Sequence, residues 1–206
     1  MAPPAYVSRL ESGVRHMAVA MTASAVAVFM GLCVELTLGH AARFTAVFAI
    51  AGLLIVAQYT VGCFRFTVRD TGLQVTGRVR TCRIASRALG VLMALVAFLG
   101  CVTALLDPTF ARTVESDEEL GLMATWSFLW AAQLIAMLTY ARWIASRIPD
   151  AAMMAVARRY RVLLPVLATV GLIFAGIGPI IGLLLWVNFL VSMRRSVQTV
   201  RADRVP

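Results

Sequence analysis

The stretch Val162–Met193, VLLPVLATVGLIFAGIGPIIGLLLWVNFLVSM, decides the fold, because it runs for 32 residues without a charged side chain. As one straight helix it would be about 48 Å long, whereas the hydrocarbon core of a bilayer is about 30 Å thick. Its centre carries the residues AGIGP. Glycine commonly follows the end of a helix and proline commonly opens the next one. Gly176, Gly178 and Pro179 therefore predict a turn between two short helices.

Four further uncharged runs are long enough to cross a bilayer, which takes about 20 helical residues. Apolar residues make up 61% of the chain and charged residues 14%, compared with about 45–50% and about 25% in soluble domains. A soluble fold of 206 residues could not bury that much apolar surface. We therefore predict an all-α integral membrane protein, a single polytopic domain over residues 1–206. Six transmembrane helices, arranged as three helical hairpins, are expected at about residues 17–38, 44–64, 88–106, 120–141, 162–177 and 179–193.

Basic residues concentrate beside these spans. The chain has 19 arginines and no lysine, and its formal net charge is +9. With the N-terminus inside, six spans place 17 of the arginines on the inner side, within residues 1–16, 65–87, 142–161 and 194–206. An unbroken last helix would leave the four arginines beyond Met193 outside. Because Lys and Arg accumulate in cytoplasmic segments, the distribution predicts six spans in a bacterial-type inner membrane, with both termini cytoplasmic.

Two inner segments have recognisable patterns. Residues 64–76 alternate apolar and polar side chains around Asp70-Thr71-Gly72, as hairpins do, so either a small two-stranded β-ribbon or an irregular basic loop is expected within 65–87. Residues 150–161 are expected to form an amphipathic helix along the inner surface. Basic side chains near a charged bilayer surface contribute about 1 kcal/mol each. The arginines expected to contact anionic lipid headgroups are Arg65, Arg78, Arg80, Arg83, Arg158 and Arg159.

Three polar residues within the spans are candidate functional residues: Glu35, Gln133 and Asn188. Ionisable residues in a membrane are costly and often functional. Glu35, however, falls near the predicted outer headgroup level, where an interfacial anchor is favoured over a proton or ion site. Gln133 lies near mid-span and Asn188 toward the inner half. Such groups usually hydrogen-bond between helices, for less than about 2 kcal/mol each, so helix–helix contact is favoured over a polar substrate path.

The sequence lacks motifs that would indicate a reaction. It contains no G-x-G-x-x-G, P-loop, H-E-x-x-H or G-x-S-x-G pattern. Its two histidines fall at opposite faces of the predicted membrane, and its four cysteines show neither a C-x-x-C pair nor metal-ligand spacing. We therefore expect no catalytic residues, no metal and no cofactor.

These features favour a non-enzymatic multi-pass membrane protein with a scaffolding, assembly or lipid-interacting role. The alternative is a small transporter or channel subunit, because interrupted helices can line transport sites. Under six spans, however, the break falls near the outer face, and the spans carry few polar groups. The expected partners are the bilayer and anionic headgroups. A homo-oligomer or a membrane-protein partner is compatible with the sequence, whereas arginines placed beside apolar spans do not indicate nucleic-acid binding.

Overall fold

The computed structural model describes residues 4–38, 45–68, 77–106, 116–146, 151–170 and 177–202. These residues contain no strand, which agrees with the all-α prediction. In a bilayer every backbone polar group must find its partner within the chain, and a helix achieves this within one segment. The six helices of the described residues are α1 (Pro4–Leu38), α2 (Thr45–Phe66), α3 (Gly77–Leu106), α5 (Ser116–Ala145), α6 (Ala151–Thr169) and α7 (Ile177–Ala202).

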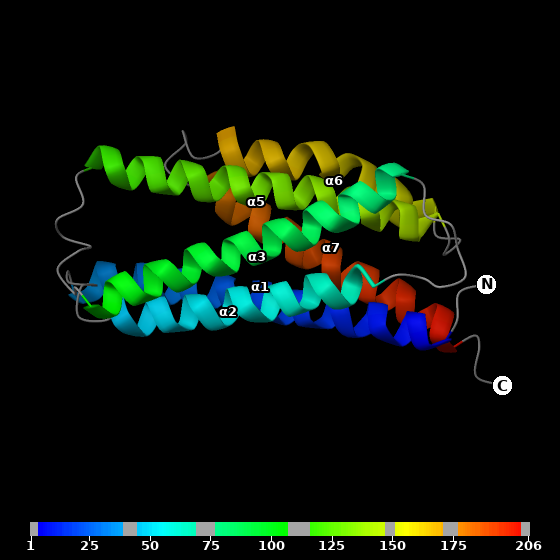
Figure 1. Cartoon of the computed structure of the whole chain (residues 1–206), viewed down its shortest axis with the longest axis horizontal. Coiled ribbons are helices and arrows are strands. Elements are labelled where there is room, and N and C mark those ends of the chain that lie inside the picture. The colour runs from blue at the N-terminus through cyan, green and yellow to red at the C-terminus, as the bar shows by residue number, and fades with distance from the viewer. Residues whose placement is uncertain are drawn as a thin grey trace.

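The helices form a closed ring (Figure 1). Each helix packs against its neighbours along the chain, and α7 returns to pack against α1. Successive helices run in opposite directions, so α1 begins and α7 ends at the same end of the bundle, which we call the terminal end. There the Gln198 side-chain Nε2 donates a hydrogen bond to Glu11 Oε1 over 3.0 Å. The side of a membrane that this end faces stays a prediction.

Five helices contain a stretch that is long and apolar enough to cross a membrane, which supports a multi-pass membrane protein. These stretches are Tyr6–Gly31, Val47–Phe66, Gly77–Thr103, Ala124–Ala145 and Ile180–Thr199. Helix α6 is not among them, because it carries three arginines near its middle and only residues 162–169 follow the last of these. A sixth crossing and the arrangement as three hairpins therefore stay predictions.

The segments expected as inner loops are largely helical. Helix α1 begins at Pro4 instead of near Met17, and α3 begins at Gly77 instead of near Ala88. The physical reason is visible in α1, where apolar residues recur at helical spacing and are buried, as on the core-facing stripe of an amphipathic helix. Those in the first turns are Val7, Leu10 and Val14.

The predicted β-ribbon within 65–87 is not confirmed. Arg65 and Phe66 end α2, and everything from Gly77 onward in this segment belongs to α3. Residues 69–76 lie outside the described residues. Likewise, Ala151 already begins α6, so the expected surface helix over 150–161 is continuous with the start of the fifth predicted span.

The predicted turn at Gly176, Gly178 and Pro179 lies partly outside the described residues. Helix α7 begins at Ile177, so Gly178 and Pro179 belong to its first turn, whereas Gly176 lies outside the described residues. Proline is tolerated in a first helical turn because the backbone N–H that it lacks would have no partner within the helix there.

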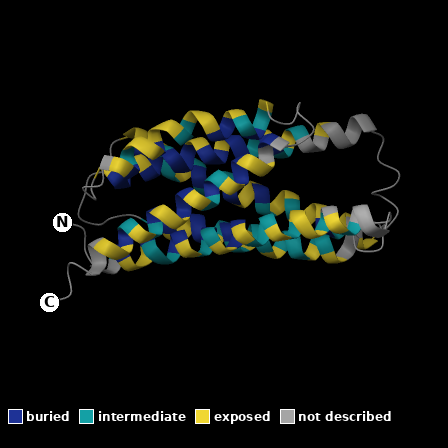
Figure 2. Ribbon diagram, turned by 180° about the vertical axis from the view of Figure 1, so that it is seen from behind, coloured by how far each residue is buried: buried dark blue, intermediate teal, exposed yellow. Residues whose placement is uncertain are grey.

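The buried core lies toward the terminal end (Figure 2). In α1 the buried side chains stop at Met21, and in α2 they begin only at Tyr59. Toward the opposite end, large apolar side chains are exposed, as for Phe29 at 67% and Leu54 at 65%. In a bilayer such side chains contact lipid, so half of the bundle is closed by packing and the other half is open to lipid.

Two glycines bring α1 and α2 into close contact within this core. A Cβ on Gly13 would lie 2.7 Å from Phe66 Cα, and a Cβ on Gly62 would lie 2.9 Å from the backbone N of Met17. No real Cβ approaches backbone atoms that closely, so both positions require glycine at the present helix separation. Small residues allow this kind of close backbone packing between membrane helices.

Replacing Gly62 with alanine is expected to lower the melting temperature of the purified protein in detergent, followed by circular dichroism. Overpacking typically costs about 1–3 kcal/mol, and it opposes the roughly 1 kcal/mol by which alanine favours a helix over glycine. The matched control is Gly52→Ala in the same helix, where a Cβ meets nothing within 4 Å and where Tm should stay or rise. Equal Tm changes in the two variants would contradict close α1–α2 packing.

Candidate functional site

Positive charge gathers toward the terminal end. The described residues include fourteen arginines, and Glu11 is the single acidic residue among them at that end. Each of the six helices carries an arginine where its uncharged stretch stops on the terminal side. We call these the boundary arginines: Arg15, Arg65, Arg87, Arg142, Arg161 and Arg194.

Arg65 ties the end of α2 to α1. Its Nη1 donates a hydrogen bond to Ser12 Oγ over 2.7 Å and lies 3.4 Å from His16 Nε2. The other ring nitrogen of His16, Nδ1, lies 2.7 Å from the Ser12 carbonyl oxygen. Arg65 nevertheless remains exposed, so its position is defined while its charge stays accessible.

Arg87 caps the C-terminal end of α2. Its Nε donates to Thr67 Oγ1 over 2.9 Å, and its Nη2 donates to the Thr67 carbonyl over 2.7 Å. The guanidinium carbon lies 5.3 Å from the centre of the Phe64 ring. The last carbonyls of a helix lack partners within the helix, and a cation there also complements the helix dipole. Arg87 was not singled out from the sequence, although it is the last charge before the uncharged run of α3.

The arginines expected to contact lipid differ in exposure. Arg78 and Arg80, in the first turn of α3, are exposed, as are Arg158 and Arg159 in α6. Arg83 is half-buried, and its Nη1 is buried without a hydrogen-bond partner among the described residues. Five of the six arginines expected to contact lipid, Arg65 included, are therefore exposed, and their contact with headgroups stays a prediction.

The three candidate polar residues are not brought together. Gln133 is fully buried between helices, where its Nε2 donates to Cys63 Sγ over 3.3 Å and its Oε1 has no partner among the described residues. Asn188 is exposed on α7. Glu35 lies in the last turn of α1, and its side chain lies outside what the structure describes.

Sulfur atoms accept several of the contacts inside the core. Cys63 receives the Gln133 hydrogen bond and itself points at Met17 Sδ, 3.9 Å away. Ser86 Oγ donates to Met137 Sδ over 2.7 Å. Sulfur is a weak hydrogen-bond acceptor. We interpret these contacts as ones that position the helices against one another. Within the described ranges, no three His, Cys, Asp or Glu side chains lie close enough together to hold a metal ion.

No protein-family model, no curated protein and no solved structure matches the chain.

Replacing Arg87 with alanine is expected to destabilise the protein more than replacing exposed Arg80 on the same helix. Hydrogen bonds that involve a charged group contribute about 1.5–3 kcal/mol, and Arg87→Ala would leave the end of α2 uncapped. Unfolding by sodium dodecyl sulfate in mixed micelles measures the difference. Equal unfolding midpoints for Arg87→Ala and Arg80→Ala would contradict the capping role.

Proposed function

We propose that the protein is a non-enzymatic, multi-pass protein of the inner membrane, with a scaffolding or assembly role, and that its terminal end binds anionic lipid headgroups in the cytoplasmic leaflet. The observation that carries the proposal is the set of boundary arginines. In all six described helices the uncharged stretch ends at an arginine, and these arginines lie on the same side of the bundle. A charged guanidinium is costly in hydrocarbon and favourable beside anionic headgroups.

The path of the last two helices supports a cytoplasmic C-terminus. Helices α1, α2, α3 and α5 make four passes along the bundle, and α6 followed by α7 returns the chain to the terminal end. Before its boundary arginine, α7 has 17 uncharged residues from Ile177 to Met193. This stretch is about 25 Å long at about 1.5 Å per residue. Snorkelling of Arg194 lengthens this reach. In this proposal both termini lie on the same side of the membrane, whether α6 and α7 each cross the bilayer or turn within it.

The interior supports a scaffold over a transporter. The buried polar side chains among the described residues are Thr67, Ser86, Ser127 and Gln133. Three of these make hydrogen bonds to neighbouring groups of the protein. The core around them consists of large apolar and aromatic side chains such as Trp186. A path for a polar solute would need polar groups at successive depths, and this half of the bundle is instead packed with apolar residues.

Neutralising the exposed arginines of α3 and α6 tests headgroup binding. A variant with glutamine at positions 78, 80, 158 and 159 should lose its preference for anionic over zwitterionic lipid by roughly tenfold or more in nanodiscs at low salt, since each basic side chain near the surface contributes about 1 kcal/mol. The difference from the unmodified protein should shrink at high salt, because the Debye length falls to about 3 Å at 1 M.

The matched control carries lysine at the same four positions. It keeps the charge and should keep the lipid preference, because the attraction depends on charge and not on guanidinium geometry. Retention of the preference by the glutamine variant, or its loss in the lysine variant, would contradict electrostatic headgroup binding at this surface.

A further inference from the structure

The contact between His16 of α1 and Arg65 of α2 defines the protonation state of the histidine. Nδ1 of His16 lies 2.7 Å from the Ser12 carbonyl oxygen, which can only accept, so this nitrogen carries a proton. Nε2 lies 3.4 Å from Arg65 Nη1, which can only donate, so Nε2 carries none. His16 is therefore neutral in this arrangement. It holds Arg65 together with the Ser12 hydroxyl, which accepts from the same Nη1 over 2.7 Å.

A second proton on His16 would place an imidazolium cation against the Arg65 guanidinium. Helix α1 packs against α2 and α7, and four of the five charged side chains that these helices carry in the turns around His16 are cations. They are Glu11 and Arg15 in α1, Arg65 in α2, and Arg194 and Arg195 in α7. The carboxylate of Glu11 accepts a hydrogen bond from Gln198. Like charges disfavour a further positive charge, so protonation of His16 is unfavourable unless an anion is bound beside it.

An exposed apolar stripe on α2 ends at Arg65. Val47, Ile50, Leu54 and Val61 are between 44% and 65% exposed, and their spacing of three, four and seven residues puts them on one face of the helix. Arg65 follows Val61 by four residues and is exposed on the same face. From Leu54 to Arg65 the helix rises about 16 Å at about 1.5 Å per residue. That distance is about half of a hydrocarbon core of about 30 Å, so the stripe below Arg65 matches the depth of one leaflet.

A phospholipid has both features that this surface complements, an anionic phosphodiester and apolar chains. The groups that hold Arg65 are a hydroxyl and a neutral imidazole, and neither offsets its charge. With a proton on Nε2, His16 becomes a donor, so one phosphate oxygen can accept from both His16 and Arg65 in charge-assisted hydrogen bonds. The bound phosphate in turn offsets the charge of the imidazolium. Phosphate binding and proton uptake therefore favour each other, as linkage requires.

We propose that Ser12, His16 and Arg65 form the phosphate site of one bound phospholipid, that an acyl chain of this lipid lies along the stripe on α2, and that the site tightens when His16 gains a proton. The proposal deepens the headgroup binding proposed above and rests on it for the position of the terminal end at a bilayer surface. The exposed arginines of α3 and α6 cannot supply this pH dependence, because a guanidinium stays charged throughout the physiological range, whereas histidine changes charge between pH 5 and 8.

The test titrates dioctanoyl phosphatidylglycerol into the full chain in dodecyl maltoside, a detergent without phosphate, and follows binding by calorimetry at pH 7.5 and at pH 5.5. Protein-free micelles provide the blank. The phosphodiester keeps one charge at both pH values, so the change of pH acts on the protein. Affinity should rise roughly fivefold at pH 5.5, the effect of one more basic group near a headgroup. Titrations in buffers with different heats of ionisation should show net proton uptake with the lipid.

Two histidine variants isolate the switch. His16→Gln cannot gain a proton and should lose both the pH gain and the proton uptake, whereas His40→Gln, the matched change at the other histidine, should keep both. Arg65→Gln should weaken binding roughly fivefold at both pH values, with a circular dichroism spectrum that stays that of the folded protein. An undiminished pH gain in His16→Gln, or unchanged affinity in Arg65→Gln, would overturn the proposal.

Two further titrations separate the alternatives. Glycerophosphoglycerol, the same phosphodiester without acyl chains, should bind at least roughly tenfold more weakly, because each buried methylene contributes about 0.8 kcal/mol. Equal affinity would mean that the site takes a free phosphodiester and would overturn the lipid. The variant with glutamine at positions 78, 80, 158 and 159 should keep the pH gain even where its general preference for anionic lipid is lost. Loss of the pH gain in that variant would place the dependence outside the His16 site and overturn it.

Discussion

The cost of placing a guanidinium in hydrocarbon is the constraint on which the rest of the structure depends. Each of the six described helices has an uncharged stretch that ends at an arginine, and these arginines lie on the side of the bundle where α1 begins and α7 ends. In the proposed topology these arginines set how deeply each helix lies in the bilayer. Arg65 and Arg87 add hydrogen bonds that join α1, α2 and α3 at this level.

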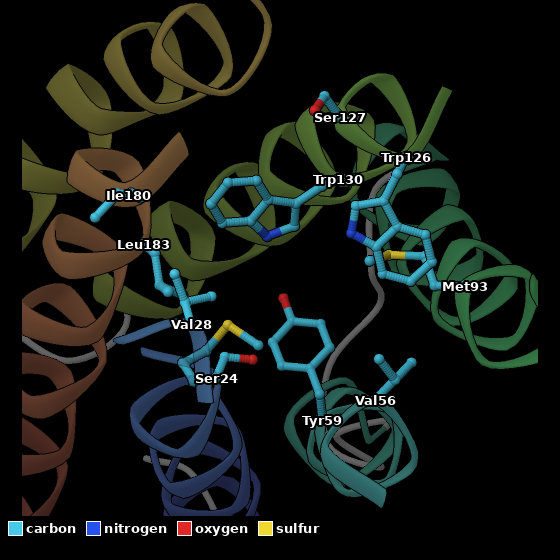
Figure 3. Close-up of a pocket in the computed structure, with 11 residues that line it drawn as sticks. Ser24, Val28, Val56, Tyr59, Met93, Trp126, Ser127, Trp130, Ile180 and Leu183 are labelled. Carbon is cyan, nitrogen blue, oxygen red and sulfur yellow. The ribbon is translucent and has the colours of Figure 1, made fainter. Parts of the chain in front are cut away.

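The packing of the bundle is uneven, and its buried core covers both the segments beyond the boundary arginines and the adjoining part of the uncharged stretches. On the terminal side the helices extend past their boundary arginines and bury apolar side chains such as Leu10 and Val197 against one another, as helices in water must. On the opposite side lipid can cover apolar surface, so the helices need not close over it. A cavity lies within the uncharged stretches, where the buried core ends, and its wall includes the rings of Tyr59 and Trp130 (Figure 3).

Much of the organisation could be predicted from the sequence, because it depends on local composition. Uncharged runs indicated membrane helices, five of which are long and apolar enough to cross a membrane. The arginine distribution predicted both termini on the cytoplasmic side, and this stays a prediction, although α1 begins and α7 ends at the same end of the bundle. The extension of the helices into the inner segments was not predicted, because the ends of the spans were placed at the nearest charged residues. Val7, Leu10 and Val14 nevertheless follow helical spacing. The close contact at Gly13 and Gly62 could not be predicted, since neither glycine indicates which helix it will meet. The cavity is harder still to predict, because residues of five helices line it.

Reporter fusions test most directly whether the boundary arginines mark the cytoplasmic face. Fusions after Ser146 and after Pro206 should both be active with a reporter that works only in the cytoplasm, and both should be silent with one that works only in the periplasm. This result follows from four passes before α6 and a return of α6 and α7 to the same side. A periplasmic signal after Pro206 together with a cytoplasmic signal after Ser146 would mean that the last two helices make a single crossing. It would contradict the shared side of the termini and the account built on it.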